Sequence, residues 1–271
     1  MSNKETDDTL EASRQSRIAP KLGSMANWPW WLIVAILIAL VIILQIVTNQ
    51  RMSIIFSAIA AGIGVTLRVT LTAYFAAVVI GLIVGFARVS SNKIIFNVAS
   101  FYVEVVRGVP ILVLLMYIAF VAVPLVADLL GVRTRDFPNE LRVILGLAIA
   151  YGAFESEIFR AGIQSIEKGQ MEAARAIGMS YFQAMRHIIL PQAIRRVLPA
   201  LGNDFIAMLK DSSLVSVLGV EDITQITKLY AASTFLFFQS YSILAFIYLS
   251  MTILLSRMVR ALETRLSAHN R

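Results

Sequence analysis

The sequence predicts an all-α membrane protein with about six transmembrane helices. Of its 271 residues, 58% are hydrophobic and only 15% are charged, and the mean hydropathy is +0.75. A soluble domain carries about 25% charged residues. Stretches without any acidic or basic side chain cover residues 22–50, 69–87, 108–127 and 229–256. Because about 18 consecutive apolar residues can cross a bilayer as a helix, each stretch is long enough to span.

The remaining segments complete the expected order of elements. Residues 1–27 form a polar tail that is expected to be disordered, and residues 28–49 form the first helix, which is too long for a secretory signal. Residues 60–262 are expected to hold five more helices. Two of these helices, near 143–162 and 194–220, are apolar but carry a few charges. Residues 263–271 are expected to form a C-terminal tail.

The distribution of positive charge orients these helices. Six crossings place both termini on one side, and most of the 24 lysines and arginines lie in segments on that side. The positive-inside rule makes this side the cytoplasm. The basic residues are spread over loops and form no clustered patch, so the net charge of +7 does not indicate nucleic-acid binding. The absence of cysteine and the presence of only two histidines exclude disulfides and cysteine or multi-histidine metal sites.

One cytoplasmic loop contains a polar, helix-forming segment. Residues 172–191 read EAARAIGMSYFQAMRHIILP. This is E-A-A, three residues, Gly, nine residues, Ile, one residue and Leu-Pro. The first part has strong helix formers, Gly178 can end that helix in a left-handed conformation, and Pro191 is expected to permit a sharp entry into the next helix. A second amphipathic helix is indicated by Tyr181, Phe182, Met185, Ile188 and Ile189.

Four stretches together resemble the polar amino-acid (histidine, glutamate, glutamine, arginine and opine type) permease family of ATP-binding-cassette (ABC) importers. They are GIGVTLRVTLTAYFAAVVIGLIVGFARVSSN from Gly62, YVEVVRGVPILVLL from Tyr102, EIFRAGIQSIEKGQMEAARAIG from Glu157, and LKDSSL from Leu209. The resemblance implies a type I importer transmembrane subunit: a five-helix core with one added N-terminal helix and a cytoplasmic coupling helix. The loop 163–192 would be the coupling loop, with Glu172, Ala173, Ala174 and Gly178 contacting the ATPase.

The resemblance also implies the partners and the setting. The chain would be the non-catalytic permease of amino-acid transport, multi-pass in the bacterial plasma (inner) membrane, with no cofactor of its own. It has no G-x-x-x-x-G-K-[ST] phosphate loop, so ATP would be hydrolysed by cytoplasmic ABC ATPase subunits. A second permease subunit, identical or related, and a periplasmic or surface-anchored amino-acid-binding protein complete the expected assembly. The sequence does not name the transported amino acid.

Charged residues within the apolar segments give the candidate site. In the fifth span they either line the translocation path or hold a broken helix together by local pairing. The path candidates are Asn203, Asp204, Lys210, Asp211, Ser212 and Ser213. Two ion pairs at three-residue spacing are expected to be structural, Glu104 with Arg107 and Glu157 with Arg160.

Some positions depart from the family pattern or point to packing. Glu167 stands where the family usually has proline, Leu114 replaces a polar residue, and Glu155 is an extra acid near the end of the fourth span. Gly81 and Gly85 form a small-x-x-x-small pair that predicts close helix packing.

Three other functions are compatible with parts of the sequence. The chain could belong to another ABC importer, for methionine or a solute that is not an amino acid, although LKDSSL argues against this. An ion-coupled secondary transporter would need coupling sites near the midplane and often an internal repeat; Asp204 could serve, but no repeat is visible. A membrane scaffold without transport activity would not explain the costly charges within the bilayer.

Overall fold

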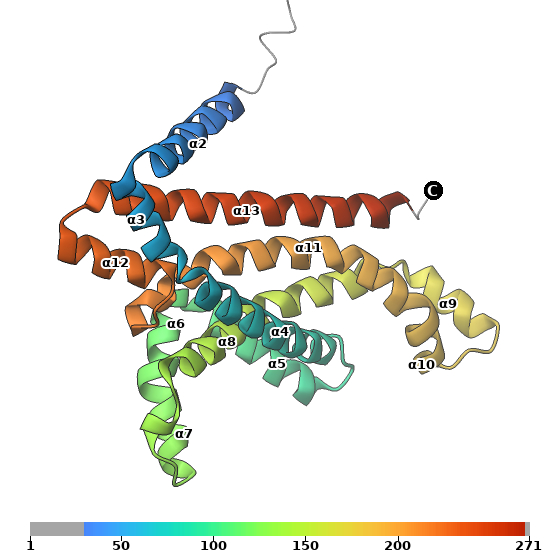
Figure 1. Ribbon diagram of the computed structural model, residues 1–271. Coiled ribbons are helices and arrows are strands. Elements are labelled where there is room, and N and C mark those ends of the chain that lie inside the picture. Colours follow the sequence, from blue (N-terminus) through green and yellow to red (C-terminus); the bar gives the residue numbers. More distant parts are fainter. Residues whose placement is uncertain (1–29, 269–271) are drawn as a thin grey trace, which may run out of the picture. The chain divides into compact units, whose positions relative to one another are not determined.

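The computed structural model describes residues 30–268, which are nearly all helical (Figure 1). They divide into two units, helix α2 (Trp30–Thr48) and a helical bundle from Asn49 onward. Helix α2 has 19 residues of almost uniformly apolar sequence, so at 1.5 Å per residue it is about 28 Å long. A helix is therefore present where the first spanning helix is predicted, and its apolar part, Ile33–Thr48, is shorter than the three candidate spans described below. The predicted N-terminal tail lies outside the described residues, as do residues 269–271.

The bundle begins with α3 (Gln50–Ala60), α4 (Ile63–Ala87) and α5 (Lys93–Gly108), followed by α6 (Ile111–Tyr117), the π-helix η2 (Ile118–Ala122) and α7 (Val123–Leu129). The 3₁₀ turn η3 (Thr134–Asp136) leads to α8 (Asn139–Gln164), α9 (Lys168–Ala176), α10 (Tyr181–Ala184) and the π-helix η4 (Met185–Ile189). The chain continues with α11 (Leu190–Asp211), the 3₁₀-helix η5 (Ser212–Leu218), α12 (Ile223–Thr234) and α13 (Phe237–Ala268).

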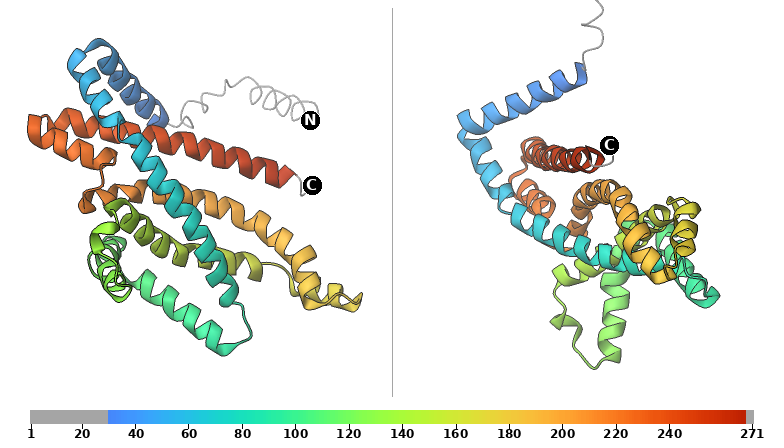
Figure 2. Two further views of the ribbon diagram at one scale, coloured as in Figure 1. Left: turned by 60° about the horizontal axis from the view of Figure 1, so that its bottom comes forward. Right: turned by 90° about the vertical axis from the view of Figure 1, so that its right-hand side faces the viewer.

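Three helices of the described chain are long and apolar enough to cross a membrane. They cover Gln50–Ala87, Ile111–Leu129 and Phe237–Thr264, and the shorter apolar helix Ile33–Thr48 lies in α2. Helices α8 and α11 have 26 and 22 residues, but they carry the charged side chains that the sequence singled out. Figure 1 shows α4, α8 and α11 in the same bundle, with α9 and α10 at the end opposite α12. Figure 2 shows α6 and α7 diverging from the bundle near the start of α8.

The core of the bundle is the contact between α4 and α8. Buried small and branched side chains from both helices meet there, among them Ala73, Ala77 and Leu147. Gly81 and Gly85 allow this close approach: a Cβ atom at Gly81 would lie 2.6 Å from the Cβ of Glu155, and one at Gly85 would lie 2.8 Å from the Cβ of Phe159. The predicted packing role of this glycine pair is therefore confirmed, because neither position has room for a side chain.

A second cluster joins α3, α12 and α13. Ile55, Ile59, Ile223 and Ile243 are fully buried there. The charge-free run 229–256 is not one continuous helix, because α12 ends at Thr234 and Phe235 takes a left-handed conformation with φ 58°. The last spanning helix therefore begins at Phe237. A lack of charge indicates burial in lipid, but it carries no information about a break in the backbone.

Both π-helical segments precede a proline by the same spacing. The segments 118–122 and 185–189 are each followed by one residue and then by Pro124 or Pro191. Proline lacks an N–H, and its ring clashes with the carbonyl four residues earlier. The wider π turn gives the ring room, and the N–H of Leu190 donates to the carbonyl of Met185, five residues earlier, instead of to the carbonyl four residues earlier. Pro191 was expected to mark a sharp entry into the next helix; that prediction is wrong, because helical structure continues through it.

Candidate functional site

Helix α9 ends in the left-handed glycine cap that the sequence predicts. Gly178 has φ +89°, its N–H donates to the carbonyl of Arg175 at 3.0 Å, and the N–H of Met179 donates to the carbonyl of Ala174 at 3.1 Å. These two bonds form a Schellman motif, which satisfies carbonyls that the helix end leaves free. The motif turns the chain sharply between α9 and α10, and it depends on a conformation that only glycine adopts without strain.

A capping box then starts the second helix of the loop. The Ser180 hydroxyl accepts from the N–H of Gln183 at 3.2 Å, and the Gln183 side chain accepts from the N–H of Ser180 at 2.8 Å. This pairing satisfies two free donors at once. Ile189 and the half-buried Met185 face an inner cluster. Local hydrogen bonds therefore define both the end of α9 and the start of α10.

The outward surface of this loop is partly apolar. Glu172, Ala173 and Gly178 are exposed, and so are the large side chains of Ile177, Tyr181 and Phe182. Ala174 differs from the expectation of direct contact with an ATPase, because it is buried within the chain. Its small side chain allows α9 to pack closely on its own protein, and the neighbouring residues form the accessible surface. A cavity of about 500 Å³, lined in part by Val89, Lys168 and Met171, lies beneath the loop.

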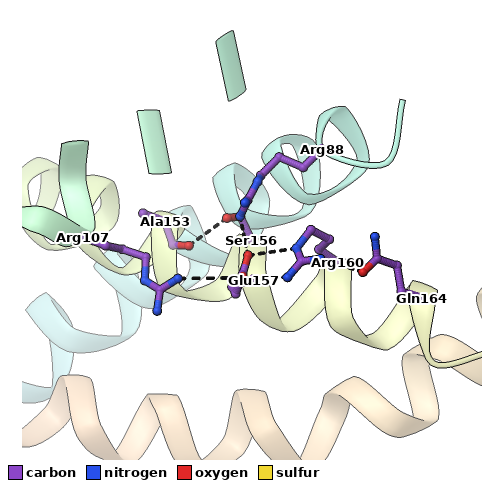
Figure 3. A network of polar contacts seen from close by, with 7 residues as sticks. All are labelled: Arg88, Arg107, Ala153, Ser156, Glu157, Arg160 and Gln164. Carbon is purple, nitrogen blue, oxygen red and sulfur yellow. Dashed lines mark hydrogen bonds and ion pairs between the residues drawn. The ribbon is translucent and has the colours of Figure 1, made fainter. Parts of the chain in front are cut away.

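Four charged side chains from three helices form a network where the end of α4 and α5 meet α8 (Figure 3). Glu157 of α8 bonds to Arg88 at the end of α4 and to Arg160 on its own helix, with 2.7 Å from Arg160 Nη2 to Glu157 Oε1 and 3.0 Å from Arg160 Nε to Glu157 Oε2. Arg160 also donates to the side chain of Gln164 at 2.6 Å. The pair of Glu157 with Arg160 thus forms as the spacing suggested. Arg88 is the added partner, which sequence spacing could not identify across 69 residues.

The expected pair of Glu104 with Arg107 does not form within the described chain. Arg107 instead lies 3.9 Å from Glu157 and places its guanidinium 5.6 Å from the ring centroid of Phe154. The packing of α5 on α8 brings Arg107 within ion-pair distance of Glu157, which also pairs with Arg88 and Arg160. In an isolated helix, Glu104 and Arg107 could pair because they are three residues apart. Here Arg107 pairs with the carboxylate of Glu157 on another helix instead.

The path candidates of α11 occupy different environments. Asn203 and Lys210 are exposed, Asp204 and Ser213 are half-buried, and Ser212 is buried. Asp211 accepts a hydrogen bond from the Tyr151 hydroxyl at 2.8 Å, at the point where α11 changes to the 3₁₀-helix η5. This contact favours the structural alternative for Asp211, because the bond ties the end of α11 to α8. Lys210 forms no ion pair with Asp211 among the described residues.

Carboxylate oxygens of Glu155 and Asp204 are buried without a hydrogen-bond partner in the described part of the bundle. Glu155 is 0% exposed, and neither of its carboxylate oxygens has a partner in the described structure; the same holds for Oδ2 of Asp204. Tyr74 of α4 lies beside Asp204, since its hydroxyl donates to the carbonyl of Leu201 at 2.7 Å and its ring stacks edge-on against Phe205 at 4.9 Å. Position along the sequence identified both acids, but only the tertiary structure reveals that Glu155 is enclosed.

The described residues thus form a bundle of long helices with charged side chains within it and a two-helix loop, α9 and α10, at one end. Residues 77–268 match the family described as binding-protein-dependent transport system inner membrane component, and the chain belongs to this family. It is therefore a multi-pass membrane protein of the permease class.

Among proteins of known name and structure, this chain is similar to permeases of amino-acid transport systems. The chain is 40% identical over 189 residues to the glutamine transport system permease protein GlnP of Escherichia coli K12, covering 70% of this chain and 84% of that protein. It is 36% identical over 194 residues to the histidine/lysine/arginine/ornithine permease protein HisQ of Salmonella typhimurium LT2, covering 70% and 85%. A crystal structure of an amino acid ABC transporter with histidines superposes with a TM-score of 0.69 at 40% identity, covering 77% of this chain and 94% of that one.

Proposed function

We propose that this chain is the permease subunit of an ABC importer that moves polar or charged amino acids into the cell. A separate cytoplasmic ATPase supplies the energy and an extracytoplasmic binding protein supplies the solute. The permease itself is not an enzyme. It works as a dimer with an identical or related permease, and both termini lie in the cytoplasm.

The rigid loop formed by α9 and α10 is the observation that carries this proposal. A Schellman motif ends α9 and a capping box starts α10, so these local bonds would help a movement of α9 to pass on to α11. Its exposed apolar side chains, Ile177, Tyr181 and Phe182, are the kind that a protein partner buries. The sequence contains no phosphate-binding loop, so the partner is the source of ATP energy.

The solute class is supported by the relatives and by the charges in the bundle. The similar proteins carry glutamine or basic amino acids in their names. Polar groups of α11, including Asn203 and Asp204, lie among apolar helices, where they would contact the charged ends of an amino acid on the path. Lys210 and Ser213, further along the chain, would contribute to the same path.

Substitution of the cap glycine tests the proposal. In Gly178→Ala, the new side chain is strained by the left-handed backbone, so ATP-driven uptake and ATPase co-purification should fall while the protein still inserts in the membrane. Gly169→Ala is the matched control, since Gly169 lies on the same loop with open space around it and an ordinary helical backbone.

The assay is amino-acid uptake into vesicles that contain the complete complex with ATP inside. Normal ATP-driven uptake by Gly178→Ala, or uphill transport by the wild-type permease with no ATPase present, would contradict the proposed mechanism.

A further inference from the structure

Arg51 stands alone among apolar residues. The sequence has no other charged side chain between Lys21 and Arg68. The apolar helix Ile33–Thr48 ends just before Arg51, and the candidate span Gln50–Ala87 begins beside it. Because a charge is costly in the hydrocarbon core of a bilayer, a lone arginine between two such segments is expected at the level of the lipid headgroups. Arg51 forms no ion pair within the described chain.

The start of α13 packs against α3 (Figure 1). Met52 and Ile55 of α3 are buried in one cluster with Ile243 of α13. The candidate span of α13 begins at Phe237, and the span formed by α3 and α4 begins at Gln50. Since two spanning segments begin at the same place, that place is a boundary between membrane and water.

A cavity of about 570 Å³ opens at this boundary. Its volume lies within the range of about 300–1,000 Å³ that is typical of small-molecule sites. Its polar lining comes from α3, from α13 and from the residue that precedes α3. The lining residues are Asn49, Gln50, Arg51, Met52, Ile54 and Gln239. Asn49 Oδ1 accepts from the N–H of Arg51 at 2.9 Å, so the side-chain NH₂ of Asn49 remains available as a donor.

The lining residues define the chemistry of a ligand. The guanidinium of Arg51 can bind a phosphate through paired N–H groups, and the carboxamides of Gln50 and Gln239 can donate to or accept from hydroxyl groups. None of the six lining residues is acidic, so the ammonium group of a zwitterionic headgroup would find no counter-charge. Ile54 and Phe238 are large, exposed apolar side chains at the same boundary, where acyl chains can cover them.

We propose that this cavity binds the headgroup of an anionic phospholipid. Arg51 contacts the phosphate, and Gln50 and Gln239 contact the hydroxyl groups of a glycerol headgroup. The bound lipid joins the start of α3 to the start of α13, and it stabilises the folded bundle because the unfolded chain has no such cavity. This role concerns the membrane around the protein and is independent of the transported solute.

The test is lipid binding to the purified full-length permease in detergent, measured by native mass spectrometry and by thermal unfolding. The probes are phosphatidylglycerol, phosphatidylcholine as the zwitterionic comparison, and inorganic phosphate as the free anion. Phosphatidylglycerol should bind more tightly than phosphatidylcholine and raise the unfolding temperature more. Inorganic phosphate should not displace it, because the free anion lacks the glycerol and the acyl chains.

Substitution of Arg51 locates the site. Arg51→Gln should weaken phosphatidylglycerol binding roughly 10- to 100-fold, the scale of a lost charge-assisted hydrogen bond, and leave phosphatidylcholine binding nearly unchanged. Arg133→Gln is the matched control and should change neither affinity. Arg133 is also exposed and also without an ion pair in the described chain, but it does not line the cavity.

Gln239→Leu is a second variant that keeps the charge. It should weaken phosphatidylglycerol binding roughly 2- to 10-fold, the scale of one neutral hydrogen bond, and it tests the site if Arg51→Gln does not fold. Equal affinity of the wild type for both lipids would overturn the proposal. So would equal weakening by Arg51→Gln and Arg133→Gln, since any surface charge would then serve. Displacement of the lipid by inorganic phosphate would assign the cavity to a free anion and overturn the lipid site.

Discussion

Replacing Glu157 by glutamine should loosen the junction of α4 and α8, and the loss can be worked out from its contacts. The carboxylate accepts bonds from Arg88 and two from Arg160, at 2.7 and 3.0 Å. Charge-assisted hydrogen bonds contribute about 1.5–3 kcal/mol each, but the Glu157 side chain is 30% exposed, so water offsets part of this. A net loss of about 2–4 kcal/mol in unfolding free energy is expected.

The coupling energy between Glu157 and each arginine should depend on how buried and how close that arginine is. The Arg88 side chain is only 11% exposed and would remain as an uncompensated charge, whereas Arg107 is 42% exposed and 3.9 Å away. Double-mutant cycles that combine Glu157→Gln with Arg88→Gln or Arg107→Gln separate the two pairs. We expect a coupling energy of about 1–3 kcal/mol for Arg88 and a few tenths for Arg107.

The assay is denaturant or thermal unfolding of the purified permease in detergent, followed by helical circular dichroism. A third cycle combines Glu157→Gln with Arg160→Gln. Because Arg160 makes two bonds to Glu157 but is more exposed than Arg88, its coupling energy should lie between those of Arg88 and Arg107. An Arg107 coupling as large as that of Arg88 would refute the reasoning, because distance and exposure would then not determine the strength of these pairs.

Two further substitutions test packing and anchoring in the bundle. Gly81→Ala places a methyl group 2.6 Å from the Cβ of Glu155 and 3.1 Å from its backbone; it should cost about 1–3 kcal/mol of stability, whereas Gly64→Ala in the same helix, with open space around it, should be neutral or slightly stabilising. Tyr151→Phe removes the 2.8 Å bond to Asp211 and should cost about 1–3 kcal/mol by leaving a part-buried acceptor unpaired; unfolding curves identical to wild type would show that Asp211 is satisfied in another way.

Much of the architecture could be predicted from local chemistry. Apolar runs long enough for a bilayer located the spanning helices, and residues with high helix propensity followed by Gly178 located the end of α9. These signals are strong for two reasons. Mostly apolar residues are stable in the lipid core of a bilayer, and glycine adopts the left-handed backbone conformation more readily than other residues. The interrupted α12–α13 segment was not predicted, since an apolar run looks the same whether or not Phe235 breaks it.

The arrangement of charges could be predicted less well. Glu157 and Arg160 lie one turn apart on a single helix, so their pairing follows from the sequence. Arg88 and Arg107 reach Glu157 from other helices, and their partner depends on how α4 and α5 pack. The burial of Ala174 likewise depends on the tertiary contacts of α9.

The sequence by itself determined that this chain is a membrane protein, that a short helix ends just before Gly178, and that acidic residues occur within the long helices. These properties follow from composition, helix propensity and spacing along one element. Only the tertiary structure decided which charges neutralise each other and which one, Glu155, remains enclosed without a partner. The reason is physical: the energy of a charge depends on every helix packed around it, and those helices are distant in the chain.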